Sequence, residues 1–338
     1  MTDTATAETS TTVHVAVGVI LGTDGKILIT QRHARQHLGG YWEFPGGKVE
    51  PDESVGQALA RELLEELNIR VISHQPLCRI THHYPDKSVL LDVHEVIAFE
   101  GEPRGMENQP MRWLDRRELR SDQFPAANRA IIRALHLPDH VMIYDCGTPA
   151  AEPLPTGALA NSALVRLRRT DSDPSPSNYC AMASKLIQRY SHNATDTQPV
   201  RFLLDTDLNS HSETLQLAKK FPLHVAGFYL NSHAAKKIPV GHQLERADDL
   251  LLGTSCHSEV ELHHAAELAV DFAIVSPVLP TTSHPGKPGM GWPAFSQLAS
   301  DFPAAVYAMG GMQLADLETA KQAGARGIAG ISMYRKQE

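Results

Sequence analysis

The chain has 338 residues, more than one compact core usually contains, so two domains are the first expectation. Hydrophobic residues make up 42% of it, as in ordinary globular proteins, which excludes a wholly disordered chain. The formal net charge is −8, and an acidic chain lacks the basic face that duplex binding requires, so no direct binding of duplex DNA is expected.

Residues 1–12 are rich in Thr, Ala, Ser and Glu, and predict a disordered tail without a targeting signal. The four cysteines are scattered and form no CxxC pair, which argues against a zinc site or a disulfide framework and favours a reducing cytoplasm. No apolar stretch approaches the roughly 20 residues that a membrane span needs, so no membrane partner is expected.

The first part of the chain predicts a strand-rich α+β domain. Residues 13–21 and 26–30 indicate two strands around a turn that contains an Asp-Gly pair. Residues 54–67 predict a helix, because apolar residues recur there at every fourth position. Three further strands and a closing helix complete this unit, at about 71–80, 88–99, 110–114 and 127–137.

From residue 138 the pattern changes to eight short apolar runs, most of them separated by amphipathic segments. The runs are 141–145, 163–168, 200–205, 224–230, 249–255, 271–276, 304–309 and 327–332. Eight buried parallel strands alternating with helices predict an α/β (β/α)₈ TIM-type barrel. Residues 148–162 are too poor in apolar periodicity for a full first crossover helix. The expected division is therefore a tail at 1–12 and domains at 13–137 and 138–338.

Acidic residues crowd one face of the helix expected at 54–67. Glu62, Glu65 and Glu66 lie three and four positions apart, although like charges at these spacings destabilise a helix by about 0.2–0.5 kcal/mol per pair. Glu53 adds a carboxylate just before the helix. A set of oxygen ligands suits a hard divalent cation, above all Mg²⁺. The alternative interpretation is a solvated acidic face.

The residues around this helix favour the functional interpretation. Gly46 and Gly47 let the backbone approach a metal or a phosphate closely. Arg61 can orient the carboxylate of Glu62 or contact phosphate oxygens. Asn68 tolerates the left-handed conformation that ends a helix.

Together these positions resemble the Nudix box: Gly, five residues, Glu, seven residues, Arg-Glu, an aliphatic, any residue, Glu-Glu, any residue, Gly, an aliphatic. The matching residues are Gly47, Glu53, Arg61, Glu62, Leu63, Glu65, Glu66 and Ile69. The single departure is Asn68 in place of the second Gly. The resemblance implies a Nudix fold, with a mixed sheet between helices. It also implies a pyrophosphohydrolase that acts on nucleoside triphosphates with Mg²⁺, for which Mn²⁺ can substitute.

The resemblance extends over about residues 13–137 and is closest to the MutT-type 8-oxo-dGTP diphosphatases. The strings that carry it are ITQRHARQHLGGYWEFPGGK, YPD, FEGEPRGMENQP and FPAAN. Hydrolysis of 8-oxo-dGTP to 8-oxo-dGMP and pyrophosphate, a DNA-repair-related sanitation of the nucleotide pool, is the implied function.

The resemblance also assigns residue roles. Nucleotide contacts fall on Arg32, His37, Glu43, Phe44, Pro45, Gly46, Gly47, Lys87 and Asn128, the last of which reads the purine edge. Metal ligands fall on the Gly46 carbonyl and on Glu62, Glu65, Glu66 and Glu107. The expected catalytic group is Glu62 as general base, Arg61 and Glu53, with roles that can exchange among the glutamates. In the alternative interpretations, Arg32 and Lys87 are surface charges, His37 is a loop histidine and Asn128 is a helix N-cap.

Residues 138–335 resemble the thiamine-phosphate synthase and thiazole tautomerase superfamily. The strings LLGTSCHSEVE, VSPVLPTTSHPGKPGMGW, VYAMGGM and GARGIAGIS carry this resemblance. It implies a site for a small phosphate ester at Gly310, Gly311 and Gly330–Ser332. It also implies a possible acid/base histidine, His257, close to Ser255.

Several positions depart from this family. Arg168 is kept, but Thr170 replaces a lysine, and the metal-binding Asn-Asp pair appears as Asp205-Thr206. Two further changes fall near Ala234 and at His284. They predict that the barrel lacks thiamine-phosphate synthase activity, and leave it as a thiazole tautomerase or a non-catalytic sensor of a phosphate ligand. The fused barrel also raises an alternative Nudix substrate, a pyrophosphate of the thiamine pathway.

Overall fold

The computed structural model describes residues 12–35, 38–84, 88–146, 163–170, 175–191, 200–281, 286 and 288–334. The chain forms two compact units, residues 1–132 and 133–338, and each is described by itself. The boundary expected at 137/138 stays a prediction. The tail predicted at 1–12 lies outside the described residues except for Thr12, which begins the first strand.

The N-terminal unit is built on a seven-stranded mixed sheet. Its main path is β3-β2-β1-β6-β5, while β4 pairs with β1 and β7 pairs with β2. β1 and β6 run parallel, and the remaining pairs are antiparallel. The strands are β1 (Thr12–Leu21), β2 (Ile27–Gln31), β3 (Trp42–Glu43), β4 (Gly46–Lys48), β5 (Arg70–His83), β6 (Ser88–Glu100) and β7 (Met111–Leu114). The mixed sheet of the predicted Nudix fold is confirmed.

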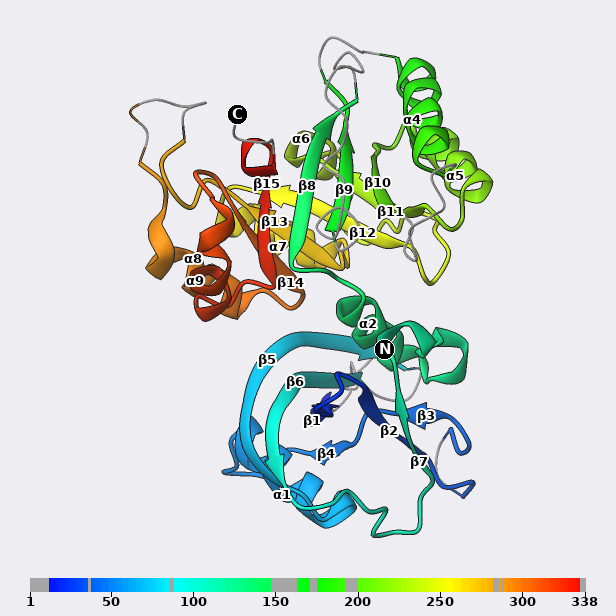
Figure 1. Cartoon of the computed structure of the whole chain (residues 1–338), viewed down its shortest axis with the longest axis vertical. Coiled ribbons are helices and arrows are strands. Elements are labelled where there is room, and N and C mark those ends of the chain that lie inside the picture. Colours follow the sequence, from blue (N-terminus) through cyan, green and yellow to red (C-terminus); the bar gives the residue numbers. More distant parts are fainter. Residues whose placement is uncertain are drawn as a thin grey trace, which may run out of the picture. The chain divides into compact units, whose positions relative to one another are not determined.

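Helix α1 (Val55–Leu67) packs against this sheet (Figure 1). Its apolar side, with Leu59, Leu63 and Leu67 fully buried, forms a core with Ala16 and other residues of the sheet. This packing leaves Glu62 and Glu66 half-buried beside β4, and Glu65 exposed. The predicted helix is thus confirmed.

Both ends of α1 are fixed by local chemistry. Ser54 and Gln57 form a reciprocal capping box at the N-terminus. Asn68 takes the left-handed conformation, with φ 56°, and its N–H bonds the carbonyls of Leu63 and Leu64. The predicted cap is therefore confirmed. The unit continues with two short 3₁₀ turns, η1 (Arg116–Glu118) and η2 (Ser121–Gln123), and with α2 (Ala126–Leu135), in which the division between the units falls.

The C-terminal unit contains a closed parallel barrel in the order β10-β11-β12-β13-β14-β15-β8-β9. Its strands are β8 (His140–Asp145), β9 (Ala163–Arg168), β10 (Arg201–Asp205), β11 (Val225–Leu230), β12 (Leu251–Cys256), β13 (Phe272–Val275), β14 (Ala305–Met309) and β15 (Gly327–Gly330). The predicted eight-stranded barrel is confirmed. Residues 148–162, where no full helix is expected, lie outside the described residues.

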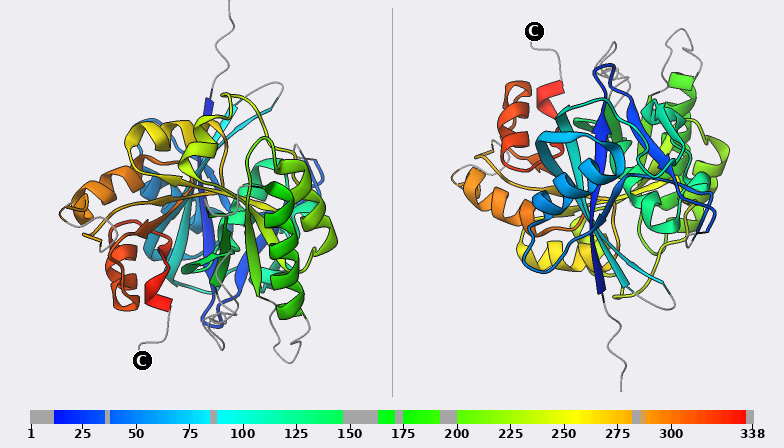
Figure 2. Two further views of the ribbon diagram at one scale, coloured as in Figure 1. Left: turned by 90° about the horizontal axis from the view of Figure 1, so that it is seen from above. Right: turned by 90° about the horizontal axis from the view of Figure 1, so that it is seen from below.

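Helices surround the barrel strands, as Figure 2 shows from two directions. They are α4 (Pro176–Ser191), α5 (His211–Lys220), α6 (Ser232–Lys236), α7 (Glu259–Glu267), α8 (Gly291–Asp301) and α9 (Leu317–Gln322), with the short turns η3 (Leu314–Asp316) and η4 (Ser332–Tyr334). A large core fills the space between strands and helices, and a smaller one, with Tyr229, Phe272 and Tyr307, fills the barrel interior. Gly253 makes room for Phe272, because a Cβ there would lie 2.2 Å from its Cζ atom.

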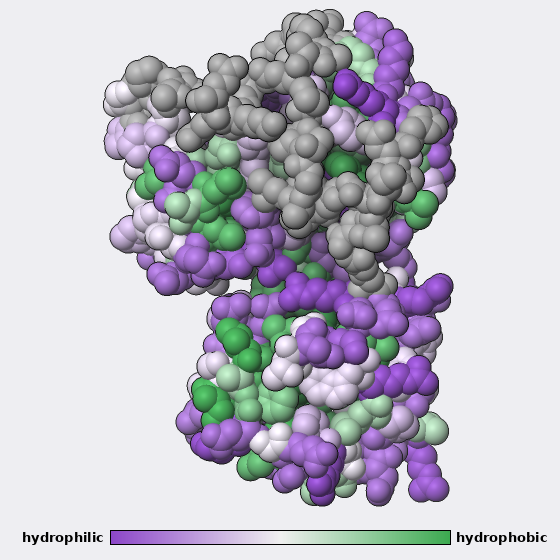
Figure 3. All heavy atoms as spheres, in the orientation of Figure 1, coloured by the Kyte–Doolittle hydropathy of each residue, from purple (hydrophilic) through white to green (hydrophobic). Residues whose placement is uncertain are grey.

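Hydrophilic residues dominate the face of the molecule in Figure 3, and hydrophobic residues are scattered in small groups between them. In the described part of the chain, none of the helices has the length and apolar character needed to cross a membrane.

Candidate active site

Arg61 donates hydrogen bonds to three segments of the N-terminal unit: β4, the residues just before α1, and α1 itself. Its guanidinium donates to the two carboxylate oxygens of Glu53 at 3.0 and 2.9 Å, to Oε1 of Glu62 at 2.8 Å and to the Lys48 carbonyl at 3.0 Å. The bonds from Arg61 lower the pKa of Glu53, and those to Glu53 and Glu62 raise the pKa of Arg61. Glu65 lies 3.6 Å from the same guanidinium. Glu53 therefore holds Arg61, and Arg61 holds the carboxylate of Glu62.

Sequence reasoning does not find the Lys48 carbonyl. A backbone carbonyl leaves no pattern in the sequence. This acceptor for Arg61 becomes evident only because the fold places β4 beside α1.

The two glycines of β4 lie directly beside the glutamates of α1. Gly46 donates its N–H to Oε2 of Glu66 at 3.2 Å. Gly46 also has a φ of +144°, and a Cβ on it would lie 2.1 Å from the carbonyl oxygen of Ala16 in the neighbouring strand. A Cβ on Gly47 would lie 2.1 Å from Cδ of Glu62. Glycine is needed at both positions because the strand and the carboxylates approach so closely.

Four carboxylates, those of Glu43, Glu62, Glu66 and Glu107, influence one another in this unit. Burial raises the pKa of Glu66 to about 8, and the negative charges of Glu43, Glu62 and Glu107 add to the effect. Burial also raises the pKa of Glu43 to about 7, against the attraction of Arg32 and with the help of Glu107. Ionisation of both Glu43 and Glu66 at neutral pH is therefore disfavoured unless a cation offsets their charge.

The donor set fits a divalent cation, since its side-chain donors are all carboxylate oxygens. The side chains are not yet arranged around an ion: within the described ranges, no three His, Cys, Asp or Glu residues form a ready metal-binding group. Glu62 is held by Arg61, and Glu66 by the N–H of Gly46.

Two polar atoms of the predicted nucleotide site are buried and have no hydrogen-bond partner among the residues that the structure describes. They are Nε of Arg32 and Oδ1 of Asn128. The Arg32 guanidinium also lies 3.3 Å from Glu43. Asn128 is the third residue of α2 and not its N-cap, because the helix begins at Ala126, so the cap interpretation is wrong. Buried polar atoms are normally satisfied, so these two atoms can accept a partner from outside the described residues, such as a ligand or a water.

The other predicted nucleotide residues are partly described. Phe44 is buried and stacks on Phe124 at 5.4 Å between ring centroids, and Pro45 is buried beside it. Phe44 thus joins the segment after β3 to the residues that precede Asn128. His37 and Lys87 lie outside the described residues.

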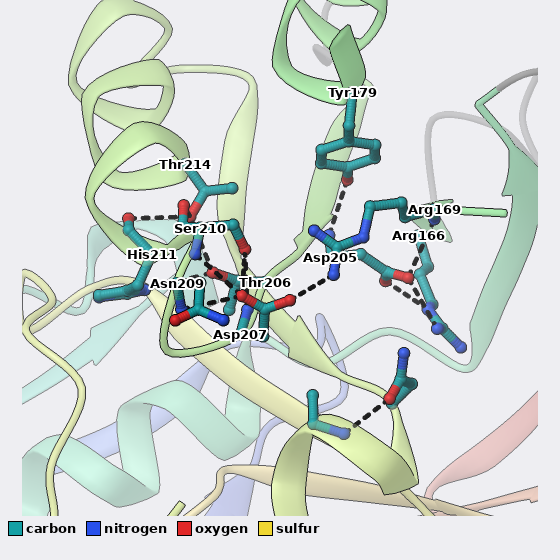
Figure 4. Close-up of polar contacts among 12 residues, drawn as sticks. Arg166, Arg169, Tyr179, Asp205, Thr206, Asp207, Asn209, Ser210, His211 and Thr214 are labelled. Atoms are coloured by element: carbon teal, nitrogen blue, oxygen red, sulfur yellow. Dashed lines mark hydrogen bonds and ion pairs between the residues drawn. The ribbon is translucent and has the colours of Figure 1, made fainter. Parts of the chain in front are cut away.

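Ion pairs occupy the carboxyl ends of the first barrel strands. Arg166 donates to both oxygens of Asp205 at 2.7 and 2.9 Å, and the N–H of Arg169 donates to the same carboxylate at 3.0 Å (Figure 4). Arg168 donates in the same way to both oxygens of Asp145, at 2.5 and 2.9 Å. Because Arg166 and Asp205 are both buried, separating them would leave a charge without its partner. The carboxylate of Asp205 therefore pairs with arginine and is not available as a metal ligand.

The positions that depart from the family also lack metal-binding geometry. Thr206 is buried and bonds the hydroxyl of Thr214 on α5 at 2.9 Å. Ala234 is buried in α6, and Thr170 is described but carries no charge. His284 lies outside the described residues.

Ser255 and His257 lie at the carboxyl end of β12 with different partners. The hydroxyls of Ser255 and Tyr229 share a hydrogen bond of 2.8 Å. His257 is exposed, and its Nδ1 lies 2.8 Å from the carbonyl oxygen and 3.2 Å from the hydroxyl of Ser276.

The predicted phosphate loops follow β14 and β15. Gly310 and Gly311 have φ of 98° and 69°, and a Cβ on either would collide with the segment 277–280. Gly330 ends β15, and Ser332 begins η4. These glycines allow close packing of the loops, and backbone N–H groups in such turns can receive an anion.

In comparisons with known proteins, two family models match separate parts of the chain. The model of the NUDIX domain family matches residues 16–134, and the thiamine monophosphate synthase model matches residues 164–334. The 8-oxo-dGTP diphosphatase of Escherichia coli (strain K12) is 39% identical over 121 residues, which cover 36% of this chain and 94% of that protein. The CTP pyrophosphohydrolase of the same organism is 40% identical over 111 residues, which cover 33% of this chain and 81% of that protein.

A solved MutT structure, from work on Aliivibrio salmonicida and Vibrio cholerae, is 36% identical and covers 37% of this chain and 97% of that one. The TM-score between the two chains is 0.33. The chain belongs to the NUDIX family, with a Nudix pyrophosphohydrolase domain at its N-terminus. Through its C-terminal barrel it also belongs to the thiamine monophosphate synthase family.

Proposed function

We propose that the N-terminal unit hydrolyses 8-oxo-dGTP to 8-oxo-dGMP and pyrophosphate, with Mg²⁺ or Mn²⁺. Such an activity removes an oxidised nucleotide before it enters DNA. The four free cysteines and a nucleotide substrate suit a cytoplasmic protein. Relatives of equal identity act on 8-oxo-dGTP and on CTP, so the choice of base rests on the site itself.

In the proposed reaction, water attacks a phosphorus atom, and the bond to the pyrophosphate leaving group breaks. Glu62 accepts the proton of the water, and Arg61 sets the position of its carboxylate through their 2.8 Å bond. Glu53 acts through Arg61 as a positioning residue. The bound cation supplies charge neutralisation on the phosphates and a lower pKa for the attacking water. The residues that would hold it are the Gly46 carbonyl, Glu62, Glu65, Glu66 and Glu107.

The proposed preference for 8-oxo-dGTP rests on Oδ1 of Asn128. This buried oxygen can only accept a hydrogen bond, and no group of the described chain supplies one. Guanine presents the acceptors N7 and O6 on its Hoogsteen edge. Oxidation at C8 places a hydrogen on N7 and turns that position into a donor. An acceptor on Asn128 therefore favours the oxidised base over guanine.

Pyrophosphate release from 8-oxo-dGTP, dGTP, CTP and thiamine diphosphate tests this proposal. Asn128→Ala should lower the discrimination between 8-oxo-dGTP and dGTP by about 1–3 kcal/mol, the usual cost of leaving a buried polar partner unpaired. Asn178→Ala is the matched control, since Asn178 is also the third residue of a helix but is exposed on α4. Equal losses of kcat/KM for both nucleotides would reduce Asn128 to a structural role. Preferred hydrolysis of thiamine diphosphate would favour the alternative substrate.

For the barrel, we propose binding of a small phosphate ester without synthesis of thiamine phosphate. The pairing of Asp205 with Arg166 supports this, because it removes a carboxylate from any metal-pyrophosphate site. The glycine turns at Gly310 and Gly311 remain available for a monoester phosphate. The exposed imidazole of His257 at the end of β12 keeps thiazole tautomerase activity open beside a sensor role.

A further inference from the structure

The loop between β6 and β7 closes the C-terminal end of α1. The last carbonyls of a helix lack partners within it. Here the N–H of Arg104 donates to the Leu67 carbonyl at 3.0 Å, and the N–H of Met106 donates to the Glu66 carbonyl at 2.9 Å. The loop that carries Glu107 is thus fastened to the turn of α1 that carries Glu66.

The side chain of Gln109 makes a second connection between the same two elements. Its Nε2 donates to the Glu66 carbonyl at 3.0 Å, and its Oε1 accepts from the N–H of Glu107 at 2.9 Å. One amide group therefore spans the backbones of both glutamates. The turn closes tightly around it: a Cβ on Gly105 would lie 2.9 Å from Oε1 of Gln109. Asn108 takes the left-handed conformation, with φ 60°, to complete this turn.

The carboxylate of Glu107 has little to fix it otherwise. Its side chain is 59% exposed, and the imidazole of His33 lies 4.0 Å away. The charge of Glu107 nonetheless contributes to the raised pKa of Glu43 and of Glu66, so the three carboxylates lie within electrostatic reach. The place of Glu107 in this group is consequently set by its backbone, and the Gln109 amide holds that backbone.

We propose that Gln109 is a positioning residue, which sets Glu107 against Glu66 so that both can bind one divalent cation. The proposal rests on the proposed metal-dependent function. Gln109 does not contact the metal or the nucleotide, and it acts only through Glu107. Groups that orient metal ligands commonly change metal affinity by about 10- to 100-fold when they are replaced.

The test is Mn²⁺ binding to the full chain, followed by the electron paramagnetic resonance signal of free Mn²⁺. Gln109→Leu keeps the approximate size but removes both hydrogen bonds, and we expect Mn²⁺ to bind about 10-fold more weakly. The Mn²⁺ concentration for half-maximal hydrolysis should rise by a similar factor, while kcat at saturating Mn²⁺ stays close to that of the native protein. Gln109→Asn keeps the amide, but its side chain is too short to span both backbones. This variant should therefore weaken Mn²⁺ binding by a similar factor. If thermal melting shows that the leucine variant is poorly folded, Gln109→Asn serves as the test variant in its place.

A double-mutant cycle with Glu107→Ala separates this proposal from the proposed function. If Gln109 acts through Glu107, Gln109→Leu should weaken Mn²⁺ binding no further once Glu107 is alanine. If the two losses multiply, or if Gln109→Leu binds Mn²⁺ normally while Glu107→Ala does not, the positioning role is wrong and the metal site stands. If Glu107→Ala itself binds Mn²⁺ normally, the assignment of Glu107 as a ligand fails.

Gln75→Leu is the matched control. Gln75 also bonds a glutamate, with its Nε2 3.0 Å from Oε2 of Glu95, but it lies on β5 and has no part in the proposed metal site. Its replacement should leave Mn²⁺ binding unchanged. A loss equal to that of Gln109→Leu would mean that any glutamine-to-leucine change in this unit disturbs the metal site, which would overturn the proposal.

Discussion

Gly47→Ala should stop catalysis without unfolding the protein. The new Cβ would lie 2.1 Å from Cδ of Glu62 and 2.3 Å from both of its oxygens. Because ordinary contact begins near 3.4 Å, the carboxylate must move by about 1.3 Å. That movement breaks its 2.8 Å bond to Arg61. A displacement of about 1 Å in a catalytic group can cost about 10²-fold in rate, so we expect kcat to fall by at least that factor.

Stability should respond much less. Gly47 is not among the glycines with positive φ, so alanine fits its backbone and reduces the entropy of the unfolded chain. The clash falls on the end of a flexible side chain, which can turn away. The melting temperature should therefore shift by no more than about 4 °C.

The assay is pyrophosphate release from 8-oxo-dGTP at saturating Mg²⁺, with Glu62→Gln as the benchmark. Removing the charge of the proposed general base should itself cost at least about 10²-fold. If Gly47→Ala acts only by displacing Glu62, the double variant should be no slower than the slower single variant. Gly56→Ala on α1 is the control, since its Cβ would approach only the His74 ring, at 3.1 Å, and its activity should be near normal. Turnover close to native by a folded Gly47→Ala protein would refute the reasoning.

The remaining predictions concern pH and the barrel. Metal binding requires ionised carboxylates, so Mn²⁺ affinity should rise as the pH passes through about 8, the pKa of the proposed ligand Glu66; an affinity that is constant over this range contradicts the proposed ligand set. The raised pKa values of Glu43 and Glu66 mean that the folded metal-free protein binds more protons than the unfolded chain, so chemical denaturation should show stability falling between about pH 4.5 and about pH 8. Calorimetry on the full chain should detect a thiazole phosphate monoester, and mixing it with the pyrimidine pyrophosphate should yield no thiamine phosphate; robust synthesis would overturn our interpretation of Asp205 and Thr206. If the native protein isomerises the thiazole ester, His257→Ala should abolish this while binding persists, whereas no isomerisation by the native protein indicates a sensor.

The sequence by itself determined the features that depend on local patterns. Apolar residues at every fourth position and an Asn that favours the left-handed conformation predicted α1 and its cap. Eight short apolar runs separated by amphipathic segments predicted the closed barrel. The spacing of glutamates and of Arg61 predicted which residues share one side of a helix, because helical geometry alone decides this.

Only the tertiary structure decided which distant groups meet. Nothing in the residues near Gly47 shows that its missing Cβ makes room for Glu62, since β4 and α1 are brought together by the sheet. The Lys48 carbonyl and the Gln109 amide are also invisible to a motif, because one is a backbone group and the other acts on backbones.

Burial and partners decided the chemistry of the remaining residues. Asn128 was predicted from a motif, but its unpartnered oxygen depends on what surrounds α2. Thr206 was noted as a lost metal ligand, yet the commitment of Asp205 to Arg166 required the register of β9 against β10. The raised pKa values of Glu43 and Glu66 arise from desolvation and from charged residues, most of them far away in sequence, which only the folded chain brings together.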